Sequence, residues 1–438
     1  MFLKRYEPKE TEHINYTLTA FYAMIALMIV FGVVSPLFSV LAFIIYALYI
    51  CVSKPQDIYL SMFFLVSFAN IFKTSAASTS FFTYLIILAA MKLVFSVKKF
   101  NSKFVVGWLL LLIYILVGSN LDLKNIIKQA LILPMVCFFF SMDKPNVKHV
   151  VLSYANGLIL SSFVAQFKKI IPNMSKYLTA GKTFELEENV ERFTGLYSDP
   201  NYYTMAVILA MSLVLVLYVN RVIGKGAYVY SLIFVFFGVQ TVSKSFMLML
   251  AFIVLFFAIL LIKNKKKIES LIYIGLVLIV VTLIFNGSIS IFDNIIERFL
   301  NYEGGDITTN RANIWNNYIE YLSLNFDKLI WGAGVGAPLL MKVAAHSTYI
   351  DLVYYYGVVG GFLFSLVLFF AFRNAGKIQK NIMAFFPMIC LVINAAFVSC
   401  LMAYDLTFNL ILACMVLTSN FKENQGNQFV DKKSEEYK

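Results

Sequence analysis

Four basic side chains occupy polar stretches between long apolar runs: Arg192, Lys244, Arg311 and His346. A phosphate or diphosphate is bound best by several positive hydrogen-bond donors at once, which arginine and lysine supply. If the fold brings these residues together, they predict an anion site with an imidazole beside it. For Lys244, the competing interpretation is that its side chain only extends from a helix end to interfacial water.

The segment Arg192–Asn201 reads Arg-Phe-Thr-Gly-Leu-Tyr-Ser-Asp-Pro-Asn. Asp199 followed by Pro200 is typical of an N-cap and first helical residue, so a helix is predicted to begin here. A helix amino terminus beside an arginine favours binding of an anion. A capped helix with an ordinary surface arginine fits the spacing equally well.

A later polar stretch contains Arg311 and Trp315, which share one face of a helix because they are four residues apart. An arginine stacked on a tryptophan at the membrane interface is the alternative for this pair. The run Gly332–Gly336 follows no strand, so it does not indicate a nucleotide site. We interpret it as a tight, flexible turn that lets the backbone approach a ligand.

His346 precedes a long apolar run in the stretch His-Ser-Thr-Tyr-Ile-Asp, with Ser347 as the expected N-cap. The positive end of the helix dipole disfavours imidazolium, so His346 is predicted to be neutral, as a general base requires. Asp351 lies in the first turns of the same run, where an ionisable group suggests function. A polar boundary residue is the alternative for His346.

The elements that must position these residues are membrane helices. The chain has 438 residues, 60% of them hydrophobic and 14% charged, with a mean hydropathy of +0.78. Soluble domains have about 45–50% apolar and about 25% charged residues. We predict an all-α integral membrane protein with 12–14 transmembrane helices. The expected spans lie near 17–34, 37–53, 57–72, 79–96, 104–118, 125–141, 149–171, 201–220, 226–242, 245–262, 268–286, 347–371, 382–400 and 403–419.

The distribution of basic residues predicts the orientation. With the amino terminus in the cytoplasm, the net charge of +12 falls mainly in cytoplasmic loops and both tails, as the positive-inside rule requires. Short outer loops contain little charge, namely Lys73, Lys124 and Lys244. Because the basic residues lie in short loops between spans, a nucleic-acid partner is not expected. The first apolar run is long enough to be an uncleaved helix rather than a signal peptide.

A single membrane domain is expected over residues 1–421, with a disordered cytoplasmic tail at 422–438. Two long loops, about 172–200 and 286–346, fall on the outside. The second contains two helical patterns, Ile291–Leu300 and Ile314–Leu322, which predict amphipathic helices on the membrane surface or over a cavity. The five cysteines have no paired spacing, so neither a disulfide framework nor a metal site is expected.

Taken in order, these motifs resemble the O-antigen polymerase and O-antigen ligase superfamily. The resemblance covers roughly residues 191–361 and is carried by Arg192-Phe193-Thr194-Gly195, Ser198-Asp199-Pro200-Asn201, Ser243-Lys244-Ser245, Asn310-Arg311 with Trp315, Gly332-Ala333-Gly334, His346-Ser347-Thr348-Tyr349-Ile350-Asp351 and Tyr356-Gly357-Val358-Val359-Gly360. One departure is Lys244, where the family often has arginine. Lysine keeps the charge but loses bidentate binding.

The resemblance implies an inverting glycosyltransferase that needs neither a metal nor a nucleotide sugar and no other cofactor. Its donor would be an oligosaccharide on undecaprenyl diphosphate, polymerised into O-antigen or capsular polysaccharide at the outer face of a bacterial cytoplasmic (inner) membrane. Arg192 and Arg311, with Lys244, would bind the departing diphosphate. His346 would orient or deprotonate the acceptor hydroxyl, and Asp199 and Asp351 would support the site.

Two alternatives remain at this point. An O-antigen ligase, which transfers the finished glycan to the lipid A core, shares the same motifs. A flippase or other transporter of lipid-linked oligosaccharide would place charged residues near the middle of the membrane. Here the polar residues concentrate in the two outer loops. By resemblance, a co-polymerase that regulates chain length is an expected partner.

Overall fold

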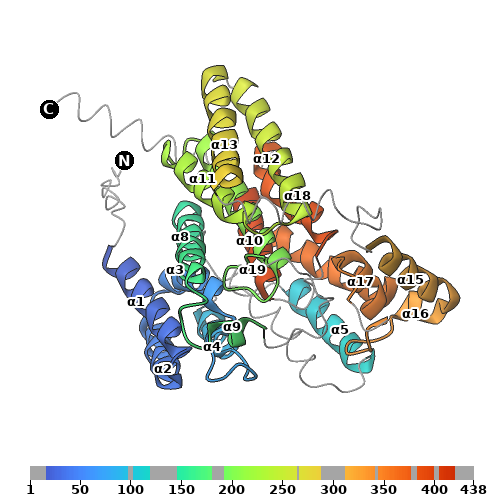
Figure 1. The fold of residues 1–438 in the computed structure, drawn as a ribbon. Helices are drawn as coiled ribbons and strands as arrows, with labels where there is room; N and C mark the ends of the chain where they lie inside the picture. The colour runs from blue at the N-terminus through green and yellow to red at the C-terminus, as the bar shows by residue number, and fades with distance from the viewer. Residues whose placement is uncertain are drawn as a thin grey trace, which may run out of the picture.

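The structure is a computed structural model that describes residues 16–96, 102–118, 146–179, 192–263, 266–287, 311–340, 344–375, 382–398 and 404–419. Within these ranges the chain forms only helices and the turns between them (Figure 1). The helices are α1 (Tyr16–Gly32), α2 (Pro36–Val52), α3 (Pro55–Leu65), the 3₁₀ turn η1 (Val66–Phe68), α4 (Phe81–Ser96), α5 (Ser102–Gly118), α8 (Val147–Gln166), α9 (Met174–Thr179), α10 (Pro200–Val219), α11 (Gly226–Val239), α12 (Lys244–Lys263), α13 (Lys267–Gly287), α15 (Arg311–Leu324), α16 (Phe326–Trp331), α17 (Thr348–Ala375), α18 (Ile382–Ala395) and α19 (Tyr404–Thr418).

Helices occupy thirteen of the fourteen positions where the sequence predicts spans. The predicted span 125–141, the amphipathic pattern Ile291–Leu300 and the tail 422–438 lie outside the described residues. The second amphipathic pattern is confirmed as α15. Its buried face is Ile314, Tyr318 and Leu322, whereas Ile319 is exposed.

Four helices are long and apolar enough to cross a membrane: α8, α10, α12 and the stretch Thr348–Phe370 of α17. Several shorter apolar helices accompany them. Large apolar side chains on the outer helices are exposed, for example Leu48 at 63% and Leu255 at 62%. A surface of this kind is stable against lipid but unfavourable in water. The protein is therefore a multi-pass, all-helical membrane protein.

Helix α10 forms the centre of the molecule. All but two of its twenty residues are buried, because α8, α11, α12, α18 and α19 surround it (Figure 1). Its N-cap is Asp199, whose side chain accepts a hydrogen bond from the Asn201 amide at 2.6 Å, and Pro200 is the first helical residue. The sequence prediction of a capped helix start is thus confirmed.

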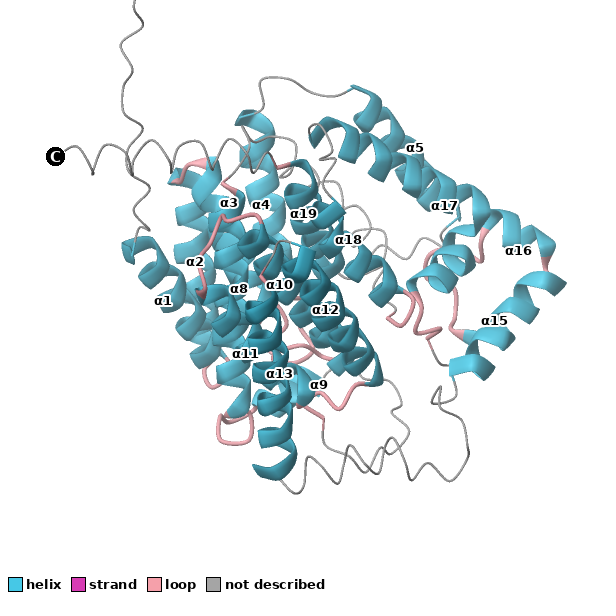
Figure 2. Ribbon diagram, turned by 90° about the horizontal axis from the view of Figure 1, so that it is seen from above, coloured by secondary structure: helices cyan, strands magenta, loops and turns pink. Residues whose placement is uncertain are grey.

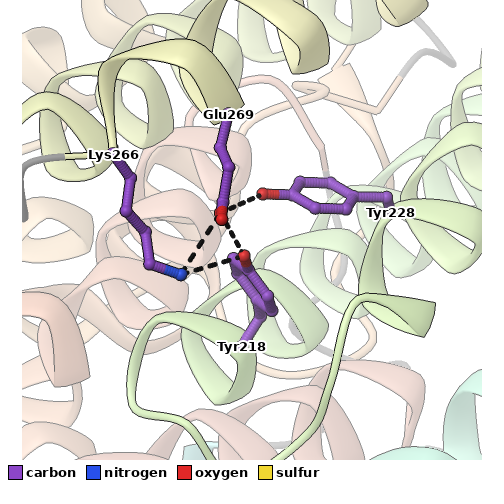
Figure 3. Close-up of polar contacts among 4 residues, drawn as sticks. All are labelled: Tyr218, Tyr228, Lys266 and Glu269. Carbon is purple, nitrogen blue, oxygen red and sulfur yellow. Dashed lines mark hydrogen bonds and ion pairs between the residues drawn. The ribbon is translucent and has the colours of Figure 1, made fainter.

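The helices α10 to α13 alternate in direction, so this group has two ends. At one end, here called the site end, the amino termini of α10 and α12 lie beside the carboxyl terminus of α11. At the opposite end, Tyr218 of α10 and Tyr228 of α11 meet Lys266 and Glu269 at the start of α13 (Figure 3). Twenty residues of α10 separate the ends by about 30 Å.

A second group of helices, α5, α15, α16 and α17, lies to one side of α10 in both views (Figures 1 and 2). Helix α17 does not run unbroken as the sequence predicts, because Gly357 inside it has φ 63° and ψ −177°. The break exposes carbonyl groups that would lack partners in lipid. Amides of Ala333 and Gly334 donate to the Tyr354 and Tyr355 carbonyls at 2.7 and 3.2 Å.

Tyr114 of α5 completes this arrangement. Its hydroxyl group lies within hydrogen-bond distance of the Trp331 and Tyr356 carbonyls, at 2.6 and 2.7 Å. The turn at residues 332–336 therefore packs against the backbone of α17. A Cβ atom on Gly332 would lie 2.5 Å from the Tyr355 carbonyl oxygen, which explains why the turn requires glycine.

Candidate functional site

The site begins with the backbone that leads Arg192 to the start of α10. The Phe193 amide donates to the Gln240 carbonyl at 3.1 Å, which holds this segment against the end of α11. The Arg192 guanidinium donates through Nε to the Thr241 carbonyl at 3.0 Å. Through Nη2 it reaches Asn201 Oδ1 at 3.5 Å. Two acceptors therefore fix the guanidinium plane at the amino terminus of α10.

Asn201 links α10 to α12. Its Oδ1 also accepts a hydrogen bond from the Ser243 hydroxyl at 3.3 Å. Because the arginine can only donate, its contact assigns oxygen rather than nitrogen to this position of the amide. Asn201 is 8% exposed and Ser243 is 2% exposed. Sequence reasoning did not single out either residue, although both lie inside the motifs that it identified.

Lys244 is the first residue of α12, and Ser243 is its N-cap, since the Phe246 amide donates to Ser243 Oγ at 3.4 Å. A cation at a helix amino terminus is unfavourable, typically by about 0.3–1 kcal/mol, because the helix dipole is positive there. Val242, which precedes the N-cap Ser243, has φ 49°, which is strained for a β-branched residue. The position of Lys244 and the backbone of Val242 both cost stability. A bound anion would offset the cost of the lysine.

Arg311 reaches the same region on α15. It is the first residue of that helix, and one turn later the indole of Trp315 donates to the Ala345 carbonyl at 2.8 Å. This bond holds the start of α15 against the residue that directly precedes His346. The sequence placed Arg311 and Trp315 on one helix face, and the helix is confirmed.

His346 lies immediately before Ser347 and the start of α17, and its φ of 52° is in the left-handed region, which is uncommon for a non-glycine residue. Burial lowers the pKa of its imidazole below the ordinary 6.5, and the charge of Arg311 lowers it further, whereas Asp199 opposes this shift. The direction agrees with the sequence prediction of a neutral ring. The causes identified here are burial and Arg311 rather than the helix dipole.

These electrostatic effects also report proximity. Because Arg311 and Asp199 both act on His346, three segments far apart in the sequence meet at one place. Asp199 belongs to the same turn as Asn201, which contacts Arg192 and Ser243. The structure therefore brings Arg192, Lys244, Arg311, His346 and Asp199 to the site end.

Asp351 has a different environment from the other acidic candidate. It is 6% exposed, and its negative charge raises the pKa of Tyr318 on α15, after the larger effect of burial. Asp351 therefore lies on the side of α17 that faces α15. Its predicted supporting role stays a prediction.

Chemically, this end offers fixed cations and an imidazole held neutral. That combination can bind a phosphate group and accept a proton from a neighbouring hydroxyl. Among the described residues, no group of three or more His, Cys, Asp or Glu side chains has the arrangement of a metal site.

Comparison of the chain with family models, with curated proteins and with solved structures finds no match.

Proposed function

We propose that this chain is a membrane glycosyltransferase that uses a lipid diphosphate-linked oligosaccharide as donor. In this reaction a growing glycan moves from undecaprenyl diphosphate to the free end of another lipid-linked repeat unit. The reaction takes place at the outer face of the bacterial cytoplasmic membrane and produces O-antigen or capsular polysaccharide. The resemblance of residues 191–361 to the O-antigen polymerase and ligase superfamily motivates the choice of substrate.

One observation carries the proposal: Arg192, Lys244 and Arg311 come from three separate segments to the site end, where Arg311 acts on the imidazole of His346. Arg192 is oriented by Thr241 and Asn201, and Arg311 acts electrostatically on His346. A diphosphate leaving group gains negative charge as its bond breaks. Fixed cations therefore stabilise the transition state more than the bound substrate.

In the proposed step, an acceptor hydroxyl oxygen attacks the anomeric carbon of the donor sugar. The bond from that carbon to the phosphate oxygen breaks, and its electron pair leaves with the diphosphate. The hydroxyl proton passes to His346, whose lowered pKa keeps it available as a base near neutral pH. A single displacement of this kind inverts the configuration at the anomeric carbon.

The test is complementation of a deletion strain with Arg192→Ala and with His346→Ala, followed by gel analysis of the surface glycan. Loss of the ladder, with single repeat units still attached to the core, supports polymerisation. Loss of all attachment identifies the ligase reaction instead. A normal ladder in both variants contradicts the proposal, provided that immunoblots show equal amounts of protein.

A transporter is excluded or identified by a second measurement on the same strains. Lipid-linked repeat units that accumulate at the cytoplasmic leaflet in the variants would indicate a flippase. Units that accumulate at the outer leaflet, unpolymerised, support the transferase. Accessibility of the units to an externally added glycosidase distinguishes the two leaflets.

A further inference from the structure

Lys73 is a buried cation that the proposed reaction does not use. It lies in the turn between η1 and α4 and is 9% exposed. Its ammonium donates to the Ala76 carbonyl at 2.9 Å and lies 5.7 Å from the ring centroid of Tyr177 on α9. Within the described part of the chain no carboxylate lies within ion-pair distance of it. Burial lowers the pKa of Lys73.

This arrangement is costly unless an anion completes it. Buried lysines are almost always paired with a carboxylate, since desolvation of a lone charge is unfavourable. An ammonium has three donors, and the Ala76 carbonyl uses one of them. The ring of Tyr177 contributes a cation–π contact but accepts no strong hydrogen bond. Among the described residues, no acidic group uses the remaining donors of Lys73.

The turn around Lys73 is rigidly built. The Ser80 hydroxyl donates to the Ala69 carbonyl at 2.6 Å, and the Phe81 amide donates to the Phe72 carbonyl at 2.7 Å. The Tyr177 hydroxyl donates to the Thr74 carbonyl at 3.1 Å, which joins the turn to α9. Lys73 is thus held in place by its surroundings, as a binding group requires.

The turn also belongs to the site end. The Asn70 amide donates to the Leu196 carbonyl at 3.3 Å, in the same short segment that carries Arg192 and Asp199. Hydroxyl groups beside Lys73 are accessible: Ser75 and Thr79 are exposed, and Thr74 and Ser78 are partly exposed. Hydroxyls of this kind can donate to phosphate or sugar oxygens.

We propose that Lys73 binds the diphosphate of a second lipid-linked substrate, the acceptor, beside the donor held by Arg192 and Arg311. This inference rests on the proposed function, because transfer between two lipid-carried chains requires two diphosphates at one membrane surface. The two differ chemically. The donor diphosphate leaves and gains charge, whereas the acceptor diphosphate keeps its charge throughout. A single ammonium therefore suffices for the acceptor, and two guanidinium groups serve the donor.

A kinetic consequence follows from that difference. Lys73 contributes equally to the ground state and the transition state, so its loss raises the KM for acceptor and leaves kcat unchanged. Loss of Arg192 lowers kcat. A lysine that only supports the turn would instead reduce the amount of folded protein and affect both substrates alike.

The experiment counts bound lipids by native mass spectrometry of the full chain in phosphatidylcholine nanodiscs with added undecaprenyl diphosphate. We expect two bound molecules on the wild-type protein. Lys73→Met should weaken one of them by about tenfold to a hundredfold, the value of a charged hydrogen bond. Lys73→Arg should retain both, because the charge remains.

Two controls separate charge from structure. Lys176→Met removes an exposed charge from α9, the helix that also contains Tyr177. It should leave both lipids bound. Tyr177→Phe keeps the ring but removes the hydroxyl bond to Thr74, so it should also retain both lipids. If Lys73→Met does not assemble, Lys73→Gln replaces it.

The outcomes distinguish this inference from the proposed function. Two lipids on Lys73→Met, or only one on the wild type that Arg192→Ala removes, would overturn the role of Lys73 and leave the proposed function intact. No lipid on the wild type would contradict the proposed function itself. Displacement of the second lipid by phosphatidylglycerol would show that Lys73 binds a bulk phospholipid, and would also overturn the acceptor assignment.

Discussion

The two ends of the α10–α13 group differ in the partners that their basic side chains contact. At the opposite end, Lys266 lies 3.2 Å from the Glu269 carboxylate and donates to the Tyr218 hydroxyl at 3.1 Å (Figure 3). Tyr218 and Tyr228 in turn donate to the same carboxylate oxygen. At the site end, Arg192 donates to the neutral oxygens of Thr241 and Asn201.

In the proposed function, this difference separates a structural charge cluster from a binding one. The Lys266–Glu269 pair is neutral overall, and two tyrosine hydroxyls donate to the same carboxylate oxygen, so the cluster joins three helices without needing a ligand. Arg192 is oriented by neutral groups, which fix the geometry of its guanidinium. In the proposed function, a cation held in this way binds the diphosphate of the substrate.

The strongest test of the comparison is Arg192→Ala. Because removal of one fixed donor to a developing negative charge typically costs about 100- to 1,000-fold in rate, we expect a loss of that size in kcat. Arg192→Lys should recover only part of the activity, since it loses the second hydrogen bond. The measurement is polymer formation by purified protein in proteoliposomes. Lys266→Met is the matched loss of charge, and a comparable drop in its kcat would refute the distinction.

The backbone break in α17 offers the next largest effect. Gly357→Ala would place a Cβ atom 2.3 Å from the Ile330 carbonyl oxygen, at a φ that disfavours side chains. Strain of this kind costs about 1–3 kcal/mol, and we expect a lower melting temperature and loss of activity, because Arg311 and His346 flank this region. Gly361→Ala, whose nearest contact is an ordinary 3.5 Å, is the control. Equal thermal stability of the two variants would count against the requirement for glycine at the break in α17.

The pKa of His346 sharpens the comparison further. Because it lies below 6.5, the ring stays neutral above that pH, and activity should be lost only as pH falls through the lower folded-state value. The stability that neutral His346 contributes is complete above its unfolded-state pKa. It is lost as pH falls through the lower folded-state pKa. Arg311→Met should raise this pKa and Asp199→Asn should lower it, since each removes one charge effect.

These shifts are measured from the pH dependence of acylation by diethyl pyrocarbonate, which modifies the neutral ring. The protein carries His13→Gln and His149→Gln, so that His346 is the one histidine left to react. Asparagine also caps helices, so Asp199→Asn should preserve the start of α10. Shifts in the same direction for both variants would argue against the proximity of these residues.

The smallest effect is expected at the opposite end. Glu269 is 28% exposed and Lys266 is 37% exposed, so solvent screens the pair. A double-mutant cycle with Glu269→Gln and Lys266→Met should give a coupling energy of about 0.2–1 kcal/mol in unfolding, with polymer formation unchanged. A coupling energy near zero would mean that the tyrosine hydroxyls alone hold these helices.

Much of the fold was predictable because lipid imposes a simple rule on the chain. Apolar stretches of sufficient length must form helices, and helices appear at the predicted positions wherever the chain is described. The break at Gly357 was not predictable from hydropathy, because it depends on carbonyl partners supplied by residues 333, 334 and 114. The same contact shows that the glycine run approaches the backbone of α17, and its approach to a ligand stays a prediction.

The candidate site was predictable in its types of residue but not in its connections. Basic residues in polar loops indicate an anion site, and the structure brings Arg192, Arg311 and His346 to one end. The role of Asn201 as an orienting group depends on the approach of α12 to α10, which no local pattern encodes. The sequence placed Lys73 in an outer loop, but its burial and its bond to the Ala76 carbonyl are properties of the folded turn.

The described partners of the α17 break precede it in the chain, and this order bears on how the protein is made. A ribosome delivers Tyr114 and the turn at 332–334 before it delivers Gly357. The exposed carbonyls of the broken helix can therefore be satisfied as soon as they enter the bilayer. During biogenesis the insertion machinery would then accept a discontinuous helix without waiting for later segments, and truncation after residue 375 should still yield this helix inserted.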